Sequence, residues 1–310
     1  PCLLPRAAAV DLITSTVLVA CFDIGAVLEI SAGDGSLAKT ERQRFSVGKG
    51  PNAVAVDLEK RNAWVWSHFD RRLTALPLDN PRRTPRTIEI PSGAPAGEKA
   101  LRRASTREEM GRRAFHEPIA FDGRSCASCH IDGRDDGLVW SSPIGQVQTP
   151  VLAGRATDTP PLGWRGENAT IEAHIKRGFE RLRGPKPNDE TLTAMARYIA
   201  TMPTYRAPSK SSLTPEEARG REIFHSAETS CSTCHAGEGV WTDGIRRNVG
   251  TGGTYDTPSL RFLGETSPYM HDGRYETLRE LLIASDGKMG FTRHLDDTDM
   301  SALIAYLKTL

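Results

Sequence analysis

Cys126-Ala127-Ser128-Cys129-His130 and Cys231-Ser232-Thr233-Cys234-His235 are two copies of one pentapeptide, and they use four of the six cysteines of this 310-residue chain. Two thiols separated by two residues can each form a thioether with one vinyl group of a haem. The histidine that follows the second thiol can then bind the iron from one side of the ring. The two copies therefore predict two covalently attached c-type haems.

Zinc and a redox dithiol are the alternatives for such a cluster. An adjacent cysteine and histidine are awkward ligands for one tetrahedral ion, and no βαβ pattern of the thioredoxin kind surrounds either motif. Covalent haem attachment takes place outside the cytoplasm, so we expect an exported, periplasmic protein. That location permits a disulfide between Cys2 and Cys21, although Cys21 lies in an apolar run and could equally be a buried free thiol.

Composition excludes some classes of function. Lys and Arg number 40 against 39 Asp and Glu, so no global charge favours nucleic acid or an anionic membrane surface. The longest strongly apolar stretch, residues 17–30, is short and contains Asp23 and Glu29, so we expect no transmembrane segment. The chain begins with Pro1 and shows no secretion signal, which predicts a processed or truncated product.

The first ninety residues alternate apolar and polar side chains between turn residues, as β-strands do. Residues 5–12 recur as residues 51–58, an offset of 46 residues that suits one β-propeller blade, and the repeats resemble those of bacterial surface-type seven-bladed propellers. Two blades cannot close a ring, so we expect upstream blades, a partner chain or the haem region to cover them. The expected strands are residues 7–12, 16–22, 26–30, 44–47, 53–58, 63–68 and 73–78.

Residues 80–100 have the Pro- and Gly-rich composition of a linker around one short strand, residues 87–90. A helical stretch follows that is rich in arginine. We interpret it either as a solvated face or as a docking patch for an acidic electron-transfer partner. Its arginines are Arg102, Arg103, Arg107, Arg112 and Arg113.

A larger repeat fills residues 111–310, with one CxxCH motif in each half. We expect two mainly helical cytochrome c modules joined near residues 207–212. The predicted fold is therefore mixed: all-β, propeller-like blades in residues 1–95, a first cytochrome c domain in 96–207 and a second in 208–310. The matching segments are residues 111–116 with 220–225, 149–152 with 257–260, 164–166 with 271–273 and the apolar helices 194–199 with 302–307.

Thr257-Pro258-Ser259-Leu260-Arg261, followed by Ser267-Pro268-Tyr269-Met270-His271-Asp272-Gly273, is close to the signature of bacterial di-haem cytochrome c peroxidases. Residues 105–310 resemble this superfamily, which includes the di-haem enzyme that matures methylamine dehydrogenase. In that family the N-terminal haem reacts and the C-terminal haem stores or relays an electron. The resemblance implies these roles for the haems at His130 and His235.

The resemblance also implies individual site residues. The family's tryptophan between the haems corresponds to Trp164, for which ordinary core packing is the alternative. The distal methionine of the second haem corresponds to Met289, with Met270 and His294 as competing ligands. Thioether ligation raises the potential of a haem relative to two histidines, which suits an electron store.

The chain departs from the family at several positions. At the position of the peroxidases' catalytic glutamine this chain has His174. At the position of their acidic residue, about ten residues further on, it has Gly184, and the nearest carboxylate in the sequence is that of Glu180. Gln148 replaces the calcium-binding asparagine. That change weakens the implied calcium site, which would also use the carbonyl groups of Thr266 and Pro268.

The resemblance implies an enzyme that reduces hydrogen peroxide, or uses it to oxidise a partner, with an electron-donor or substrate protein. The alternative is a non-catalytic electron-transfer cytochrome with two six-coordinate haems, in which His174 is a ligand. A third hypothesis makes the propeller-like repeats a substrate or surface adaptor. Residues 1–95 contain no metal-ligand cluster or catalytic constellation that would favour it.

Overall fold

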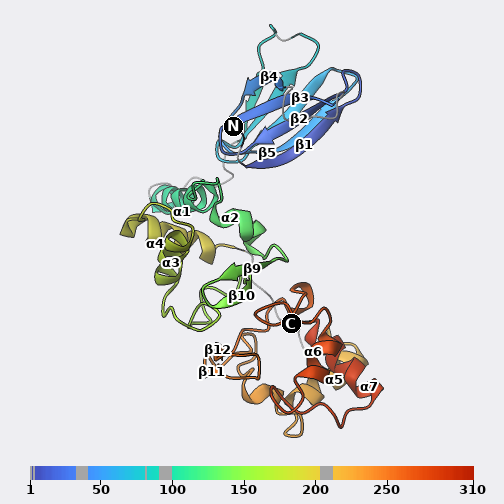
Figure 1. Cartoon of the computed structure of the whole chain (residues 1–310). Helices are drawn as coiled ribbons and strands as arrows, with labels where there is room; N and C mark the ends of the chain where they lie inside the picture. Colours follow the sequence, from blue (N-terminus) through green and yellow to red (C-terminus); the bar gives the residue numbers. More distant parts are fainter. Residues whose placement is uncertain (1, 3, 33–40, 81, 91–99, 203–211) are drawn as a thin grey trace. The chain divides into compact units, whose positions relative to one another are not determined.

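The computed structural model describes residues 2, 4–32, 41–80, 82–90, 100–202 and 212–310. They form two compact units, one of Pro1–Ala104 with Glu117–Ser125 and the other of Ser105–His116 with Cys126–Leu310 (Figure 1). Residues 81 and 91–99 of the first predicted linker, residues 80–100, and residues 207–211 of the predicted junction at 207–212 lie outside the described residues. No helix in the described part of the chain has the length and apolarity needed to cross a bilayer.

The first unit contains two four-stranded antiparallel sheets, each with its strands in chain order. In both sheets the pairing register shifts at the start, between Pro5 and Ala7 and again between Pro51 and Ala53. The sequence repeat is thus a structural repeat of blade-like sheets, and no closed propeller forms within the described residues. The strands are β1 Pro5–Asp11, β2 Thr16–Cys21, β3 Ala26–Ser31, β4 Glu41–Ser46, β5 Pro51–Asp57, β6 Asn62–Ser67, β7 Arg72–Pro77 and β8 Arg86–Glu89.

The two sheets pack face to face, with β1 beside β5 (Figure 1). Alternation along each strand sends every second side chain into the space between them. Aliphatic side chains and one phenylalanine fill that space. The shared core consists of Leu18, Ala20, Val27 and Phe45 from the first sheet and Ala63, Val65 and Leu76 from the second.

An ion pair joins the two sheets at one end. Arg61, in the turn between β5 and β6, donates hydrogen bonds of 2.8 and 2.7 Å to the two carboxylate oxygens of Asp11 at the end of β1. The Asp11 side chain is only 2% exposed. The hydrogen bonds from Arg61 hold the pKa of this carboxyl well below its ordinary value, with further help from the hydroxyl of Thr14. We call this pair the interblade latch.

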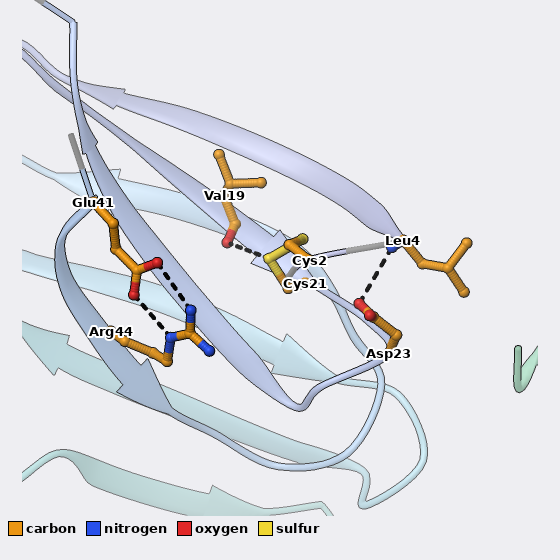
Figure 2. Close-up of a disulfide and its surroundings, with 7 residues drawn as sticks. All are labelled: Cys2, Leu4, Val19, Cys21, Asp23, Glu41 and Arg44. Carbon is orange, nitrogen blue, oxygen red and sulfur yellow. Dashed lines mark hydrogen bonds and ion pairs between the residues drawn. A yellow bond between two sulfur atoms is a disulfide. The ribbon is translucent and has the colours of Figure 1, made fainter. Parts of the chain in front are cut away.

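A disulfide fastens the start of the chain to the first sheet. Cys2 and Cys21 are bonded, with their Cα atoms 5.4 Å apart (Figure 2). Beside the bond, the backbone N–H of Leu4 donates to the carboxylate of Asp23 at 3.2 Å. Of the two possibilities that the sequence left open for Cys21, the structure therefore shows the disulfide.

The second unit is mainly helical, as expected for cytochrome c modules. Its helices alternate with short hairpins and single turns that the sequence did not predict. The elements are α1 Ala100–His116, which begins in the first unit, α2 Cys126–Cys129, η2 Ile131–Gly133, β9 Val139–Ser142, β10 Gly145–Gln148, α3 Ile171–Arg181, α4 Asp189–Ala200, α5 Pro215–His225, η4 Cys231–Thr233, β11 Arg246–Arg247, β12 Tyr255–Asp256, η5 Leu263–Glu265, α6 Leu278–Ala284 and α7 Asp297–Leu307.

The first helix of each half crosses the last helix at a glycine. A Cβ atom on Gly111 of α1 would overlap the backbone carbonyl of Ala194 in α4, and one on Gly220 of α5 would overlap that of Ala302 in α7. Only glycine permits such a close approach of two backbones. The repeat predicted from the sequence is therefore also a repeat of helix packing.

One turn beyond each crossing, the same helices meet through two aromatic rings. Phe115 packs edge-on against Tyr198 with ring centroids 5.4 Å apart, and Phe224 packs against Tyr306 at 5.6 Å. Edge-on pairs of this kind stabilise a core beyond the area they bury. Each crossing is thus closed by a large buried side chain.

We predict that Arg61→Met weakens the first unit by about 3 kcal/mol, because it leaves the buried carboxylate of Asp11 without its cation. The pKa of Asp11 is lowered in the folded state, so the latch stabilises the fold above the ordinary carboxyl pKa and loses this effect as the pH falls. Hydrogen exchange of the β1 and β5 amides at neutral pH measures the change. Arg86→Met, at an exposed arginine of β8, is the control, and equal exchange in the two variants would refute the latch.

Candidate functional site

The first CxxCH motif forms a short helical turn on the wall of a cavity. α2 contains both cysteines, and the backbone N–H of His130 closes the turn on the carbonyl of Cys126 at 2.9 Å. Cys126 and His130 line a cavity of about 400 Å³. Burial raises the pKa of the Cys126 thiol to about 12, so this thiol is protonated at neutral pH.

The second motif repeats this geometry. Cys231 lies in η4, and the N–H of His235 donates to the Cys231 carbonyl at 3.1 Å. Cys234 and His235 line a second cavity, of about 160 Å³. The cysteines of both motifs are free thiols. In each motif one cysteine and the histidine therefore line a cavity, and the second cysteine lies within the same turn.

Both motif histidines are buried in the neutral form. Burial lowers the pKa of His130 to about 4 and also lowers that of His235. Nδ1 of His235 lies 3.1 Å from the carbonyl oxygen of Trp241. Nδ1 of His130 is buried without a hydrogen-bond partner among the described residues, and the carbonyl of Pro150 acts to raise the pKa of this histidine against the effect of burial. A carbonyl that accepts Nδ1–H leaves Nε2 with a lone pair, which is the form that binds a metal.

These donors fit a c-type haem. Two free thiols, one neutral imidazole and a largely apolar cavity are what the group requires, and both motifs supply them. Zinc fits less well, because the described residues contain no group of three or more His, Cys, Asp or Glu side chains that could hold a metal ion. The apolar and aromatic lining of the first cavity includes Phe115, Val147, Leu152, Ile175, Met195 and Ile199.

Two of the three candidate axial ligands lie near the second motif. Met289 and Met270 both line the cavity of His235. His294 is exposed and interacts electrostatically with Asp299 at the start of α7. The structure therefore brings both thioethers to the second motif, and the choice of Met289 over Met270 stays a prediction.

His174 lies in the cavity of the first motif. Helix α3 begins after Thr170, whose hydroxyl accepts from the N–H of Ala173, and this start places His174 one turn along, in the cavity that His130 also lines. Nδ1 of His174 lies 3.1 Å from Nδ2 of Asn168, within hydrogen-bonding distance. Nε2 is therefore the ring nitrogen left for the cavity. Burial lowers the pKa of His174, while the carboxylate of Glu167 opposes that change.

Two carboxylates share this cavity. Glu180, the carboxylate nearest in the sequence to Gly184, lines the cavity about one and a half turns of α3 beyond His174. Glu167 also lines it, and no sequence motif pointed to this residue. Its carboxylate accepts from the N–H of Arg165 at 3.0 Å and lies 3.7 Å from the guanidinium of Arg177. Besides His130, the first cavity is thus lined by His174 and two acidic side chains.

Trp164 lines both cavities. Its indole N–H donates to the carbonyl of Gln148 at 2.9 Å, and its own carbonyl accepts from the N–H of Asp256 at 3.0 Å. The ring lies edge-on to His271 at 6.3 Å, and Tyr255 stacks on His271 with centroids 3.8 Å apart. Sequence reasoning found Trp164 but missed this row of three rings, because its members come from distant segments.

Asp256 is a second residue that the sequence did not suggest, although it stands next to the Thr-Pro motif. It lines the cavity of His235, and one of its carboxylate oxygens is buried without a hydrogen-bond partner among the described residues. Burial, helped by the negative charge of Asp243, raises the pKa of Asp256 to about 7. This carboxyl can therefore change its charge near neutral pH.

The residues of the implied calcium site lie around the same cavity. Gln148, Thr266 and Pro268 line the cavity of His235, and the N–H of Gln148 donates to the carbonyl of His271 at 2.7 Å. All three residues of the implied site therefore line one cavity. Calcium binding stays a prediction.

We predict that Asp256→Asn stabilises the protein at pH 8 by about 1 kcal/mol, a value reduced for solvent screening. The folded pKa is raised, so the native state holds its proton longer than the unfolded chain, and stability falls as the pH rises from about 4 to about 7. Hydrogen exchange around β12 at pH 5 and pH 8 should show this fall in the wild type only. Asp243→Asn breaks a 2.6 Å ion pair with Arg247 and should destabilise instead; stabilisation by both variants would contradict the assignment.

Comparison with known proteins identifies relatives of this chain. Residues 217–310 match the cytochrome c family model. The gamma subunit of hydrazine synthase from Kuenenia stuttgartiensis is 24% identical over 254 residues, which cover 60% of this chain and 72% of the relative. A cytochrome c551 peroxidase from Nitrosomonas europaea is 26% identical over 268 residues, which cover 65% of this chain and 79% of the relative.

Solved structures share the fold. The hydrazine synthase structure from Kuenenia stuttgartiensis has a TM-score of 0.60 at 20% identity and covers 74% of this chain and 100% of its own. A variant of the diheme peroxidase BthA from Burkholderia thailandensis has a TM-score of 0.50 at 16% identity and covers 74% and 90%. The chain is thus similar over most of its length to a cytochrome c551 peroxidase, and this similarity, with the repeated CxxCH motifs, supports an oxidoreductase with covalently bound c-type haem.

Proposed function

We propose that this protein reduces hydrogen peroxide, or uses it to oxidise a partner, at the haem of the first motif, while the haem of the second motif stores and relays electrons. The observation that carries the proposal is the position of His174. It shares the first cavity with His130, and its Nε2 is left available there. The two carboxylates of this cavity supply further proton-binding groups.

Haem iron, when bound, supplies the electrons, and the overall reaction consumes one peroxide, two electrons and two protons to give two waters. The chain supplies proton handling. His174 is neutral at pH 7 because burial lowers its pKa, so it can accept a proton from entering peroxide and return it to the departing oxygen. In this structure the amide nitrogen of Asn168 faces Nδ1 of His174 and also donates to the carbonyl of Leu162 at 3.3 Å. Acceptance at Nε2 requires a proton on Nδ1, so the amide must turn, give up the bond to Leu162 and accept from Nδ1–H with its oxygen.

Trp164 is our candidate for electron transfer between the two motifs. It lines both cavities, and hydrogen bonds to Gln148 and Asp256 hold it in place. The ring of His271 beside it extends the aromatic contact toward the second motif. Packing alone remains the alternative role for this tryptophan.

A non-catalytic electron-transfer cytochrome is the second candidate. The position of His174 also favours it, since an imidazole nitrogen that faces the first cavity could be the sixth ligand of the iron. In that case both haems would be six-coordinate, and peroxide would find no open position. The two functions give opposite expectations for removal of the His174 ring.

We infer two haems per chain, an electron-donor or substrate protein as partner, and export from the cytoplasm. Covalent haem attachment and the Cys2–Cys21 disulfide both support export, since disulfides persist in oxidising compartments. The three-domain division of the sequence also stays a proposal.

For His174→Ala we predict an unchanged spin state of the ferric protein and a peroxide reaction slowed by about 10²–10⁴, the usual contribution of a general acid–base catalyst. Stopped-flow spectroscopy measures both quantities. Lys176→Ala, at an exposed position of the same helix, should react as the wild type does. Mass spectrometry should show two haem additions in each variant. Conversion of the first haem from low to high spin, with a gain in peroxide reactivity, would assign His174 as a ligand.

For the second motif we predict that Met289→Leu removes the near-infrared thioether charge-transfer band of the ferric protein. Leucine has a similar volume and no sulfur, so the cavity stays filled while the ligand is lost. Met270→Leu is the matched control, because both methionines line the same cavity. A band that survives Met289→Leu and disappears in Met270→Leu would assign the ligand to Met270.

A further inference from the structure

A third, smaller cavity shares residues with each of the two motif cavities. It has a volume of about 90 Å³ and is lined by residues of both halves of the repeat. It shares Trp164 and His174 with the first cavity, and Trp164 and Asp256 with the second. The three cavities therefore follow one another along Trp164, with a histidine at one boundary and a carboxyl at the other. We call the small one the middle cavity.

The middle cavity has polar groups on its wall. The hydroxyls of Thr159 and Ser259 belong to residues that line it. The first donates to the carbonyl of Arg155 and the second to the carbonyl of Val240 at 2.7 Å. A hydroxyl that donates keeps lone pairs that can accept from water. Each water needs about 10–15 Å³ of such volume, so the cavity has room for several hydrogen-bonded waters.

Asp256 is placed at its boundary by the backbone. Its N–H donates to the carbonyl of Trp164 at 3.0 Å, so a residue of the second half is held against the first half. Oδ1 of its carboxyl is buried without a hydrogen-bond partner among the described residues. A buried polar atom without a partner costs free energy, and the cost is larger when the group is charged. This oxygen can carry a proton without giving up any existing bond.

The charges around Asp256 oppose one another. Arg246 favours the ionised carboxyl, whereas the negative charges of Asp243 and Glu167 oppose it. Burial has the largest effect and acts with the two acids, which raises the pKa of Asp256 to about 7. Arg155 lines both of the cavities that Asp256 lines, and its guanidinium donates to a backbone carbonyl of the second half at 2.7 Å. A permanent cation therefore lies on the same walls as a carboxyl that holds a proton up to neutral pH.

We propose that Asp256 stores a proton beside the second motif and supplies it to His174 through water in the middle cavity, while Trp164 carries an electron along the same path. This inference rests on the proposed function, in which peroxide reacts beside His174. Reduction of one peroxide to two waters consumes two electrons and two protons. The electron-donor protein supplies the electrons, and Asp256 supplies one of the protons. Its half-buried side chain then takes up another proton from solvent.

The proton transfer balances in bonds and charge. The O–H bond of the Asp256 carboxyl breaks, water passes the proton on, and an N–H bond forms at Nε2 of His174, the nitrogen that Asn168 leaves free. The carboxylate that remains is stabilised by the nearby cation of Arg155. His174 then gives the proton to the departing oxygen. That oxygen leaves as hydroxide, a much stronger base than an imidazole or a carboxylate, so it draws the transfer forward.

A pH profile of the peroxide reaction tests the supply of this proton. Stopped-flow spectroscopy of the haem-loaded protein, reduced before mixing with peroxide, measures how fast the second haem is reoxidised. In the wild type we expect this rate to fall as the pH rises through about 7, because Asp256 loses its proton there. Asp256→Asn should slow the reaction about 10²-fold at pH 6, the lower end of what a proton-transferring side chain contributes, and should abolish the fall near pH 7. Asp256→Glu restores a carboxyl and should restore both.

Three further variants separate the proton route from a general effect of charge. Asp297→Asn, whose side chain is 97% exposed on α7, is the matched control and should react as the wild type does. Asp243→Asn removes a charge that raises the pKa of Asp256, so the fall should move to lower pH. Ala156 lines the middle cavity but neither motif cavity. Ala156→Val narrows the middle cavity and should slow the reaction without moving the pH at which the rate falls. Mass spectrometry should show the same haem additions in every variant.

Infrared difference spectra between the reduced and oxidised protein test proton storage without peroxide. At pH 8 we expect the carbonyl band of a protonated carboxyl to appear on reduction, because the added electron favours protonation of the ionised Asp256. At pH 5 the carboxyl already holds its proton, so the band should not grow. Asp256→Asn should lack the band at pH 8, and Asp297→Asn should keep it.

The failure of this proposal differs from the failure of the proposed function. A wild-type protein that reacts with peroxide, and an Asp256→Asn variant with the same rate and pH profile, would overturn the proposal and leave the proposed function in place. An unchanged rate in Ala156→Val would refute the route through the middle cavity. Absence of the infrared band in the wild type at pH 8 would refute proton storage at Asp256. A wild-type protein that does not react with peroxide at all would instead refute the proposed function, and the delivery to His174 with it.

Discussion

The crossing of two helices at a glycine is the constraint on which each cytochrome module depends. Gly111 and Gly220 bring the first and last helices into backbone contact, and the aromatic pair beside each crossing fills the space that remains. With the helices closed on one another, the CxxCH turn and the Thr-Pro segment are left to surround a cavity. A larger side chain at either glycine would separate the helices, and the walls of that cavity would move with them.

Burial then shifts the pKa values of several groups that line the cavities. It lowers the pKa values of the motif histidines and of His174, and it raises that of Asp256 to about 7. Removing water disfavours charge on an imidazole and on a carboxylate alike, so the two kinds of group shift in opposite directions. The histidines that line these cavities are therefore neutral bases, which can bind a metal or a proton. The carboxyl of Asp256, in contrast, changes its charge near pH 7.

Local patterns in the sequence predicted most of the fold. The β-strands begin and end within a few residues of the expected positions because alternation is a local signal, and α4 and α7 extend the expected apolar segments by a few residues. Glu167, Asp256 and the stack of Tyr255 on His271 were missed. Their roles depend on contacts between distant segments, which no spacing rule encodes. The disulfide and the choice between two methionines were left open for the same reason, and only the disulfide is decided by the structure.

The two halves of the second unit meet through positions that correspond in the repeat but differ in residue type. Trp164 of the first half falls where His271 of the second half falls, and the two rings lie edge-on at the contact. Gln148 connects them, since its N–H donates to the carbonyl of His271 and its carbonyl accepts from the indole of Trp164. The helix crossings kept the same residues in both halves because both must close a cavity. The contact between the halves has no such requirement. The same position of the repeat is therefore a tryptophan that borders both cavities in the first half, and a histidine stacked against Tyr255 in the second half.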